Sequence, residues 1–396
     1  MPLNRQHLAD IYRPTGPKQI ATGLAWSQGG SQTLTQQVDL SLPIRGLRLV
    51  FKGRVVIGTA GFTSANPEGF LNLIPLIFIQ GTNARQQGNL TLWNIDLASL
   101  FVIQSLFAFR GAAFYSINSG TGEVELAPPT MPIPTTWAPI TATGTYDFRI
   151  VVDVPFHPFQ SNGFGKEPLT IPQYLVRNEE WKDSVQIILG FGTQGGGGAT
   201  GVLGTAAAGT TITYTAYGSG SGSPTIDVYS LPVLMGTTLK DQILPGVISR
   251  VSTPITTVMQ SAATGAVLLN MQKQPTPRVF FKQGVSTVSP AFSSLTDTNV
   301  TALGLQLGQN RNVRNVLDLF THKLQQADVY ARDLIQGYTM FDFMDQGNPD
   351  SAYSGQDIGD GATLQITGNV TGVANALGLL IQEQILQQPA GNLMNF

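Results

Sequence analysis

Apolar and polar residues alternate along much of the chain, which is the pattern of strands that bury one face. In "QQVDLSLPIRGLRLVFKGRVVIG" the apolar positions include Leu47, Leu49 and Phe51, and "TYDFRIVVDVPF" repeats the alternation from Tyr146 to Val154. The run "IPLIFIQG" is continuously apolar and ends in glycine, as expected for a strand buried on both sides. Glycine and proline fill the turns between such segments, so the sequence predicts an all-β protein.

The strand pattern continues after a break near residues 232–245. Short β-like segments follow, among them "GVISRVSTPITTVM", "RVFFKQGVSTV", "GYTMFDFMD" and "ATLQITGNVT". The last apolar segment, "NALGLLIQEQILQ", fits both a strand and a helix, and we favour a strand. The chain therefore reads as two β-rich blocks in tandem, between which we find no sequence repeat. Many short strands with Gly/Pro turns are typical of sandwiches and jelly rolls.

One segment predicts a helix, and a second is open between a helix and strands. "LASLFVIQSLFAF" (residues 97–109) is too short for a membrane span, which needs about 20 residues, and we expect a buried helix or two core strands. In "NRNVRNVLDLFTHKLQQA" one helical stripe carries apolar residues, with Asn310 or Asn312 as the cap. The residues of this stripe are Val313, Val316, Leu317, Phe320 and Leu324.

The stretch "FGTQGGGGATGVLGTAAAGTTITYTAYGSGSGSPT" (residues 191–225) raises the question of a phosphate-binding loop. It contains no Lys or Arg, and its glycines lead into a β-branched run rather than a helix. We therefore interpret it as a connection between strands, most mobile at residues 192–209, with "GSGSGSP" as a hairpin loop.

Charged residues are scarce. They make up 12% of the chain, against about 25% in ordinary soluble domains, and the net charge is −2. Such a composition favours a surface used for contacts between copies, although a neutral secreted β-protein is an alternative. Because no run of Lys and Arg occurs, we expect no direct sequence-specific binding of nucleic acid. The chain has no cysteine, and "MPLNRQHLADIYRP" has no apolar signal region.

The chemical groups present predict no catalytic, cofactor-binding or metal site. His7, His157 and His322 are isolated from one another, with His157 expected in a packed turn and His322 solvated on a helix. No Gly-x-Ser-x-Gly elbow occurs. The densest carboxylates are interpreted as solvated turns, with glycosidase chemistry or calcium binding as the alternatives. These carboxylates are Glu179, Glu180, Asp183, Asp342, Asp345 and Asp350.

Two stretches resemble the double jelly-roll major capsid proteins of tailless membrane-containing bacteriophages and adenovirus. "TYDFRIVVDVPFHPFQ" with "IPQYLVRNEEWKDSVQIILGFGT" resembles the first sandwich, and "ADVYARDLIQGYTMFDFMDQGNPDSAYSGQDIGDGATLQITGNVTG" the second. The resemblance covers roughly residues 36–388. It implies two tandem eight-stranded jelly rolls with a few short helices in loops.

The resemblance also implies a function. We expect pseudo-hexameric homotrimers that tile an icosahedral virion shell, with neighbouring capsomers and minor capsid or penton proteins as partners. The alternatives are a trimeric spike or receptor-binding β-protein, and a β-sandwich glycosidase.

The expected domain map has five parts. They are an N-terminal arm (1–35), a first jelly roll (36–232), a linker (233–245), a second jelly roll (246–388) and a C-terminal tail (389–396). We expect the arm to contact a neighbour or an internal membrane through Leu3, Leu8 and Ile11.

Overall fold

The computed structural model describes sixteen segments of the chain, and every structural statement below concerns them. The segments are 12–26, 32–83, 88–107, 115–117, 124–126, 142–156, 175–181, 185–235, 247–255, 264–270, 276–285, 294–307, 311–330, 335–343, 363–370 and 375–386.

The first half of the chain forms a β-sandwich of eight principal strands. They are β2 (Lys18–Ala25), β3 (Gln32–Gln37), β4 (Ile44–Gly58), β6 (Leu76–Asn83), β7 (Gly88–Ile95), β10 (Gly144–Pro155), β11 (Gln186–Phe191) and β15 (Thr225–Met235). One sheet has the order β2-β15-β4-β10 and the other the order β3-β11-β6-β7. Counted along the chain, the orders are 1-8-3-6 and 2-7-4-5, which is jelly-roll topology.

The second half repeats this topology. Its strands are β16 (Val247–Pro254), β17 (Thr264–Asn270), β18 (Arg278–Val285), β20 (Val300–Leu307), β21 (Arg311–Asp318), β22 (Tyr338–Asp342), β23 (Thr363–Val370) and β24 (Ala376–Leu386). They pair as β16-β24-β18-β22 and β17-β23-β20-β21, again 1-8-3-6 and 2-7-4-5. The predicted fold class, two tandem jelly rolls, is confirmed, and the ambiguous last segment is a strand.

Shorter elements complete the structure. They are β1 (Tyr12–Pro14), β5 (Phe62–Ala65), η1 (Gly69–Leu73), α2 (Leu97–Phe107), β8 (Tyr115–Ile117), β9 (Val124–Leu126), α3 (Asn178–Trp181), β12 (Thr200–Gly201), β13 (Gly204–Ala206), β14 (Thr211–Thr215), β19 (Ser294–Leu295) and α6 (Leu319–Tyr330). Segment 97–107 is thus a helix with buried Leu97, Leu100 and Ile103, as one of the two sequence interpretations expected. No helix among the described residues is long and apolar enough to cross a membrane.

The alternation seen in the sequence builds the core of the first sandwich. Leu47, Leu49 and Phe51 of β4 are fully buried, and Phe148 of β10 lies beside Phe70 with ring centroids 5.1 Å apart. Trp26 stacks on Phe191 across the sandwich at 4.7 Å. Period two therefore directs one set of side chains inward, as predicted.

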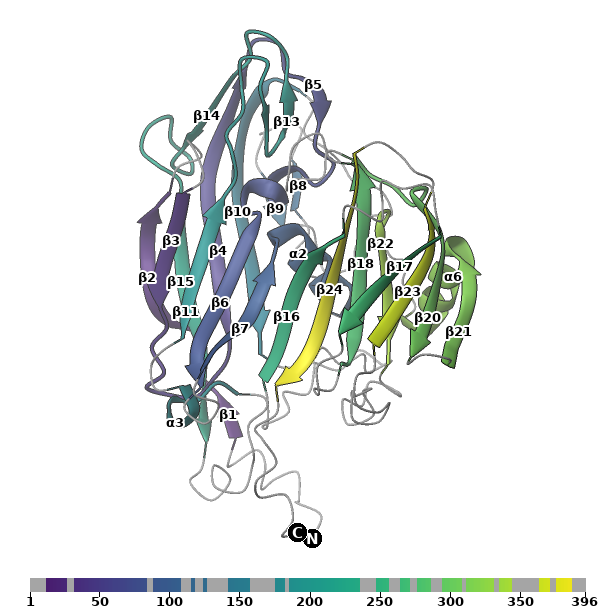
Figure 1. The fold of residues 1–396 in the computed structure, drawn as a ribbon. Helices are drawn as coiled ribbons and strands as arrows, with labels where there is room; N and C mark the ends of the chain where they lie inside the picture. The colour runs from purple at the N-terminus through teal and green to yellow at the C-terminus, as the bar shows by residue number, and fades with distance from the viewer. Residues whose placement is uncertain are drawn as a thin grey trace.

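The two sandwiches share one sheet. Strand β16 pairs in parallel with β7, Arg250 opposite Trp93 and Val251 opposite Asn94. This pairing merges the second sheet of the first sandwich with the first sheet of the second sandwich into nine strands. Figure 1 shows the result: the sandwiches stand side by side, with β2 and β3 at one end and β21 with α6 at the other.

The structure corrects the predicted helix near residue 310 and the predicted arm. Residues 311–318 form strand β21, and only residues 319–330 are helical, because residues 311–318 pair with β20 at the edge of the sheet. In the predicted arm, β1 and β2 pair with β15, so the first sandwich begins before residue 36. Leu3, Leu8 and Ile11, and most of the predicted linker and tail, lie outside the described residues.

The glycine-rich stretch connects strands, as predicted, and contains short strands of its own. Within residues 192–209, β12 and β13 pair with each other and β13 pairs with β5. The segment "GSGSGSP" is not a hairpin loop, because β14 and β15 both pair with β4 in succession along the same edge. This segment leads from β14 to β15, and β15 continues the pairing along β4.

Candidate functional site: the interface between the two sandwiches

The largest concentration of buried charge lies where the sandwiches meet. We call this region the intersandwich interface. Its members from the first sandwich are Glu68, Trp93, Asp96 and Ser99, and those from the second are Arg250, Arg278, Lys282, Tyr338 and Glu383. Helix α2 follows β7 directly and is buried against the second sandwich (Figure 1).

Lys282 is the centre of the first cluster. Its Nζ lies 2.6 Å from Oε1 of Glu68 and 3.0 Å from Oδ2 of Asp96, both on the first sandwich. The hydroxyl of Tyr338 donates to Oε1 of Glu68 at 2.9 Å and lies 3.3 Å from Oγ of Ser99. Every contact crosses the boundary, so the cluster ties β18 and β22 to η1 and α2.

Burial changes the protonation equilibria of this cluster. It raises the pKa of Glu68, and the positive charge of Lys282 offsets that rise only in part. Burial alone would lower the pKa of Lys282, but Asp96 and Glu68 outweigh it and raise that pKa. Lys282 therefore stays charged, and a proton is retained on Glu68 to a higher pH than in the unfolded chain.

Arg250 and Arg278 form the second cluster. Nε of Arg250 donates to Oε1 of Glu383, and Nη1 donates to the carbonyl oxygen of Pro155 at 3.2 Å. Arg278 lies 3.6 Å from the other oxygen of Glu383 and 3.3 Å from Asp342. The guanidinium of Arg250 stacks over the ring of Trp93 at 4.5 Å, a cation–π contact between the sandwiches.

Helix α2 supplies the apolar part of the interface. Val102 packs in a cluster with Leu295, Ile335, Tyr338 and Leu377, all of which belong to the second sandwich. The interface thus combines an apolar helix face with paired charges. A buried ion pair is stable only when the partner geometry is kept, so the arrangement fixes how the sandwiches are oriented.

The topology shows that the two sandwiches carry equivalent residues. The third strands, β4 and β18, contain "RLVFK" (48–52) and "RVFFK" (278–282). The registers agree, since Arg48 lies opposite Asp153 on β10 and Arg278 lies opposite Asp342 on β22. Arg48 is therefore equivalent to Arg278, and Lys52 to Lys282.

The helices that follow the fifth strands are equivalent as well. Asp96 precedes α2 in "DLAS", and Asp318 precedes α6 in "DLFT". Each aspartate accepts a hydrogen bond from the backbone N–H three residues later, from Ser99 at 3.2 Å and from Thr321 at 2.9 Å. Val102 thus corresponds to Leu324, and Ala98 to Phe320.

Equivalent positions differ strongly in exposure. The side chain of Arg278 is 0% exposed, whereas that of Arg48 is 37% exposed in its pair with Asp153. Phe320 is 76% exposed and Leu324 52% exposed, although Ala98 and Val102 are buried. The helix after the fifth strand is therefore covered in the first sandwich and exposed in the second. The outward face of the third strand is covered in the second sandwich and exposed in the first.

The structure places four of the residues considered in the sequence analysis. His322 is buried rather than solvated, with Nε2 3.0 Å from the carbonyl oxygen of Met340. Glu180 is buried and pairs with Arg177 at 2.9 Å, and Asp342 pairs with Arg278, so neither is a solvated turn residue. Glu179 begins α3 with Asn178. His7, His157, Asp183, Asp345 and Asp350 lie outside the described residues. Among the residues that are described, no three His, Asp or Glu gather as a metal site.

The interface residues themselves were not singled out from the sequence. The signal was present in the two Arg-x-x-Phe-Lys segments and in the two Asp-Leu-x-Ser/Thr segments, which contradict the earlier finding of no repeat. Each motif is too short to stand out among 396 residues until strand order aligns the two halves.

Comparisons with known proteins identify the fold. No protein-family profile and no curated protein sequence match the chain. The structure is similar to the STIV major capsid protein, with 12% identity, a TM-score of 0.56, and coverage of 96% of this chain and 97% of that one. It is also similar to a chain of Sulfolobus turreted icosahedral virus (13% identity, TM-score 0.54, 96% and 90% coverage) and to one of the PBCV-1 virus capsid (13%, 0.52, 95% and 95%). The chain has the double jelly-roll fold.

Proposed function

We propose that this chain is the major capsid protein of an icosahedral virus and is located in the virion shell. The observation that carries the proposal is that both jelly rolls, joined in the same chain, align over 96% of the residues with a viral capsid protein. A role in assembly also agrees with the low charge content, 12%, because interfaces between subunits are poor in charged residues.

The proposed capsomer is a homotrimer. Each chain contributes two sandwiches with the same strand order, so three chains around a threefold axis present six similar corners, and such an outline tiles like a hexagon. In this arrangement the first sandwich of one chain meets the second sandwich of its neighbour. Neighbouring capsomers and minor capsid or penton proteins are the further partners, with an internal membrane beneath the shell as a possible contact of the N-terminal residues.

The proposed role is structural rather than enzymatic. In the described part of the chain, the buried charged groups at the intersandwich interface pair with one another, and these pairs hold the sandwiches together. These charges therefore stabilise the shape of a structural subunit. Among the described residues, they do not place an acid and a base around an open site.

Light scattering and electron microscopy test the proposal. The purified chain should have three times the monomer mass of 42.3 kDa, unchanged on dilution to micromolar concentration, and hexagon-edged particles in negative stain. A stable monomer or dimer would contradict a capsomer. Elongated trimeric knobs would instead favour the spike, and release of sugar in a hydrolysis screen would favour the glycosidase.

A further inference from the structure

Helix α6 is oriented with its polar residues inward. His322 is buried, its Nε2 bonded to the carbonyl oxygen of Met340 and its ring 4.8 Å from that of Phe341. Oε1 of Gln326 accepts from the N–H of Met340 at 3.3 Å. These bonds to β22 fix which side of the helix faces the sandwich.

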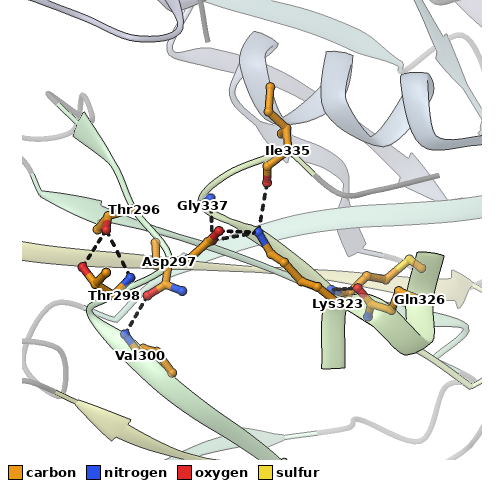
Figure 2. Close-up of polar contacts among 10 residues, drawn as sticks. Thr296, Asp297, Thr298, Val300, Lys323, Gln326, Ile335 and Gly337 are labelled. Atoms are coloured by element: carbon orange, nitrogen blue, oxygen red, sulfur yellow. Dashed lines mark hydrogen bonds and ion pairs between the residues drawn. The ribbon is translucent and has the colours of Figure 1, made fainter. Parts of the chain in front are cut away.

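A second anchor holds the same helix. Figure 2 shows Nζ of Lys323 between the two carboxylate oxygens of Asp297, each at 2.8 Å, and the carbonyl oxygen of Ile335 at 3.3 Å. Asp297 also accepts from the N–H of Gly337 at 2.8 Å. With both anchors in place, Phe320 and Leu324, four residues apart, share the outward face of α6.

The equivalent face of α2 is already in contact with a sandwich. Ala98 and Val102 are both buried, and Val102 belongs to the same apolar cluster as Tyr338 of the second sandwich. Phe320 and Leu324 occupy the same helical positions on α6 but have no sandwich beside them. The surface that would match the face around Tyr338 lies on the first sandwich.

That matching surface is the outward face of the sheet β2-β15-β4-β10. Lys52 is the equivalent of Lys282, and Arg149, which lies opposite Lys52, is the equivalent of Tyr338. Across β4, β10 and β15 this face carries four cations against three carboxylates, a net positive charge. The cations are Arg48, Lys52, Arg54 and Arg149, and the carboxylates are Asp147, Asp153 and Asp227.

The charge on α6 complements this face. Asp96, at the start of α2, pairs with Lys282 within the chain, and its equivalent Asp318 is exposed at the start of α6.

The edge strands of the two sandwiches also correspond. Within the chain β7 pairs in parallel with β16, and the equivalent strands β21 and β2 each have a described neighbour on one side only, β20 and β15.

We propose that α6 of one copy docks on the β2-β15-β4-β10 face of a second copy and repeats between chains the contact that α2 makes within one chain. Phe320 and Leu324 take the places of Ala98 and Val102. Asp318 becomes a second carboxylate partner of Lys52, which pairs with Asp227 within its own chain, as Asp96 is a second partner of Lys282 beside Glu68. The contact joins opposite ends of two copies, so it is heterologous and can close into a ring. This inference rests on the proposed trimer and names its contact surfaces.

Cysteine cross-linking tests the geometry directly, because the chain contains no cysteine. Leu324→Cys and Arg149→Cys change two exposed positions whose equivalents, Val102 and Tyr338, lie in one buried apolar cluster within the chain. After mild oxidation or treatment with a short bis-maleimide, the double variant should give covalent dimers and trimers. Each single variant should remain uncross-linked, since the contact pairs unlike ends. Cross-linking of either single variant would show a like-with-like contact and overturn the inference.

A disruption experiment provides the second measurement. Phe320→Asp with Leu324→Asp should raise the dissociation constant of the trimer at least about 100-fold, the size expected for central apolar contacts. Thr193→Asp, at an exposed position of the glycine-rich segment, is the matched control and should leave the trimer intact. Circular dichroism should show folded protein in both.

The outcomes separate this inference from the proposed function. A trimer that resists Phe320→Asp/Leu324→Asp and gives no cross-link between positions 149 and 324 would overturn the docking of α6 and leave the capsid proposal standing. A monomeric unmodified chain at micromolar concentration would overturn both. Dissociation with specific cross-linking supports both.

Discussion

Nζ of Lys282 in the second sandwich lies 2.6 Å from Oε1 of Glu68 in the first, with both side chains fully buried. Removing two charges from water is costly, and their attraction repays that cost only when the pair is close and further hydrogen bonds satisfy the remaining atoms. Here Asp96 is a second acceptor for Lys282, and the hydroxyl of Tyr338 donates to the same oxygen of Glu68. The pair is therefore stabilising only when the two sandwiches are correctly aligned.

Loss of Lys282 should be strongly destabilising. Lys282→Met leaves two buried carboxylates without their cation, and we expect a loss of about 3–5 kcal/mol in unfolding free energy. The double variant Lys282→Met/Glu68→Gln should lose less than the single variant, because the carboxylate of Glu68, which would lack its cation, is replaced by a neutral amide. Denaturant unfolding measures both. Lys18→Met, which breaks the exposed pair with Asp39, is the control and should cost less than about 1 kcal/mol. Additive losses in the double variant would contradict the pairing.

Glu68 should make stability depend on pH in an unusual direction. Because its folded pKa is raised above the ordinary value of 4.5, the folded chain binds a proton at a higher pH than the unfolded chain. The native chain thus gains stability as the pH falls through the raised pKa, until the unfolded chain is protonated as well. Glu68→Gln has no such gain.

Thermal melting of the two proteins between pH 7 and pH 5 measures this effect. The melting temperature of the native chain should rise relative to that of Glu68→Gln as the pH is lowered. Asp147 has a lowered pKa because of its bonds from Arg54, so its contribution is lost at low pH in both proteins and cancels in the difference. A difference independent of pH would show that Glu68 has an ordinary pKa.

Equivalent arginines should differ in their effect on the isolated chain. Arg278→Gln removes a fully buried cation from between Glu383 and Asp342 and should cost about 3–5 kcal/mol. Arg48→Gln removes the partly exposed partner of Asp153 and should cost about 0–1 kcal/mol. Unfolding by denaturant of dissociated protein compares the two variants. Equal losses would mean that the exposed face of β4 is already covered.

Gly204 should tolerate no side chain. Its φ is +135°, and a Cβ atom there would lie 2.2 Å from the carbonyl oxygen of Ser64, in the pairing of β13 with β5. We expect Gly204→Ala to cost about 1–3 kcal/mol through strain and clash. Gly220→Ala, with no atom within 4 Å of its Cβ, should be neutral. Early proteolysis within residues 192–209 of Gly204→Ala, absent in Gly220→Ala, would show that the pairing had opened.

Nucleic acid should bind weakly at physiological salt. The net charge is −2, and no run of Lys and Arg supplies the phosphate contacts from which most such affinity comes. Filter binding with duplex DNA and with single-stranded RNA measures this. A sub-micromolar complex that weakens steeply with added salt would contradict the prediction and give this chain a part in genome packaging.

Local pattern was enough to predict most strands and an all-β chain in two blocks, whereas the two tandem jelly rolls were implied by the resemblance to capsid proteins. The alternation through Leu47, Leu49 and Phe51 specifies which face of β4 is buried, and this information is contained in neighbouring residues. The helix that was predicted from residue 310 failed for a related reason. The spacing of Val313, Val316 and Leu317 fits a helix, but pairing of β21 with β20, with an irregular register, decided in favour of the strand.

The intersandwich interface could not be predicted because its partners are far apart in the chain. Glu68 and Lys282 are more than 200 residues apart, and the residues next to each in the sequence do not indicate that it is buried in an ion pair. Phe320 and Leu324 were predicted only to share one helical stripe. The hydrogen bonds of His322 and Gln326 to Met340 turn these two residues outward.

The parallel pairing of β7 with β16 has a mechanical consequence. A sheet shared by the two sandwiches and backed by buried ion pairs resists a change in the angle between them. In the proposed shell, curvature would then arise at the contacts between chains, and those contacts would set the radius of the shell.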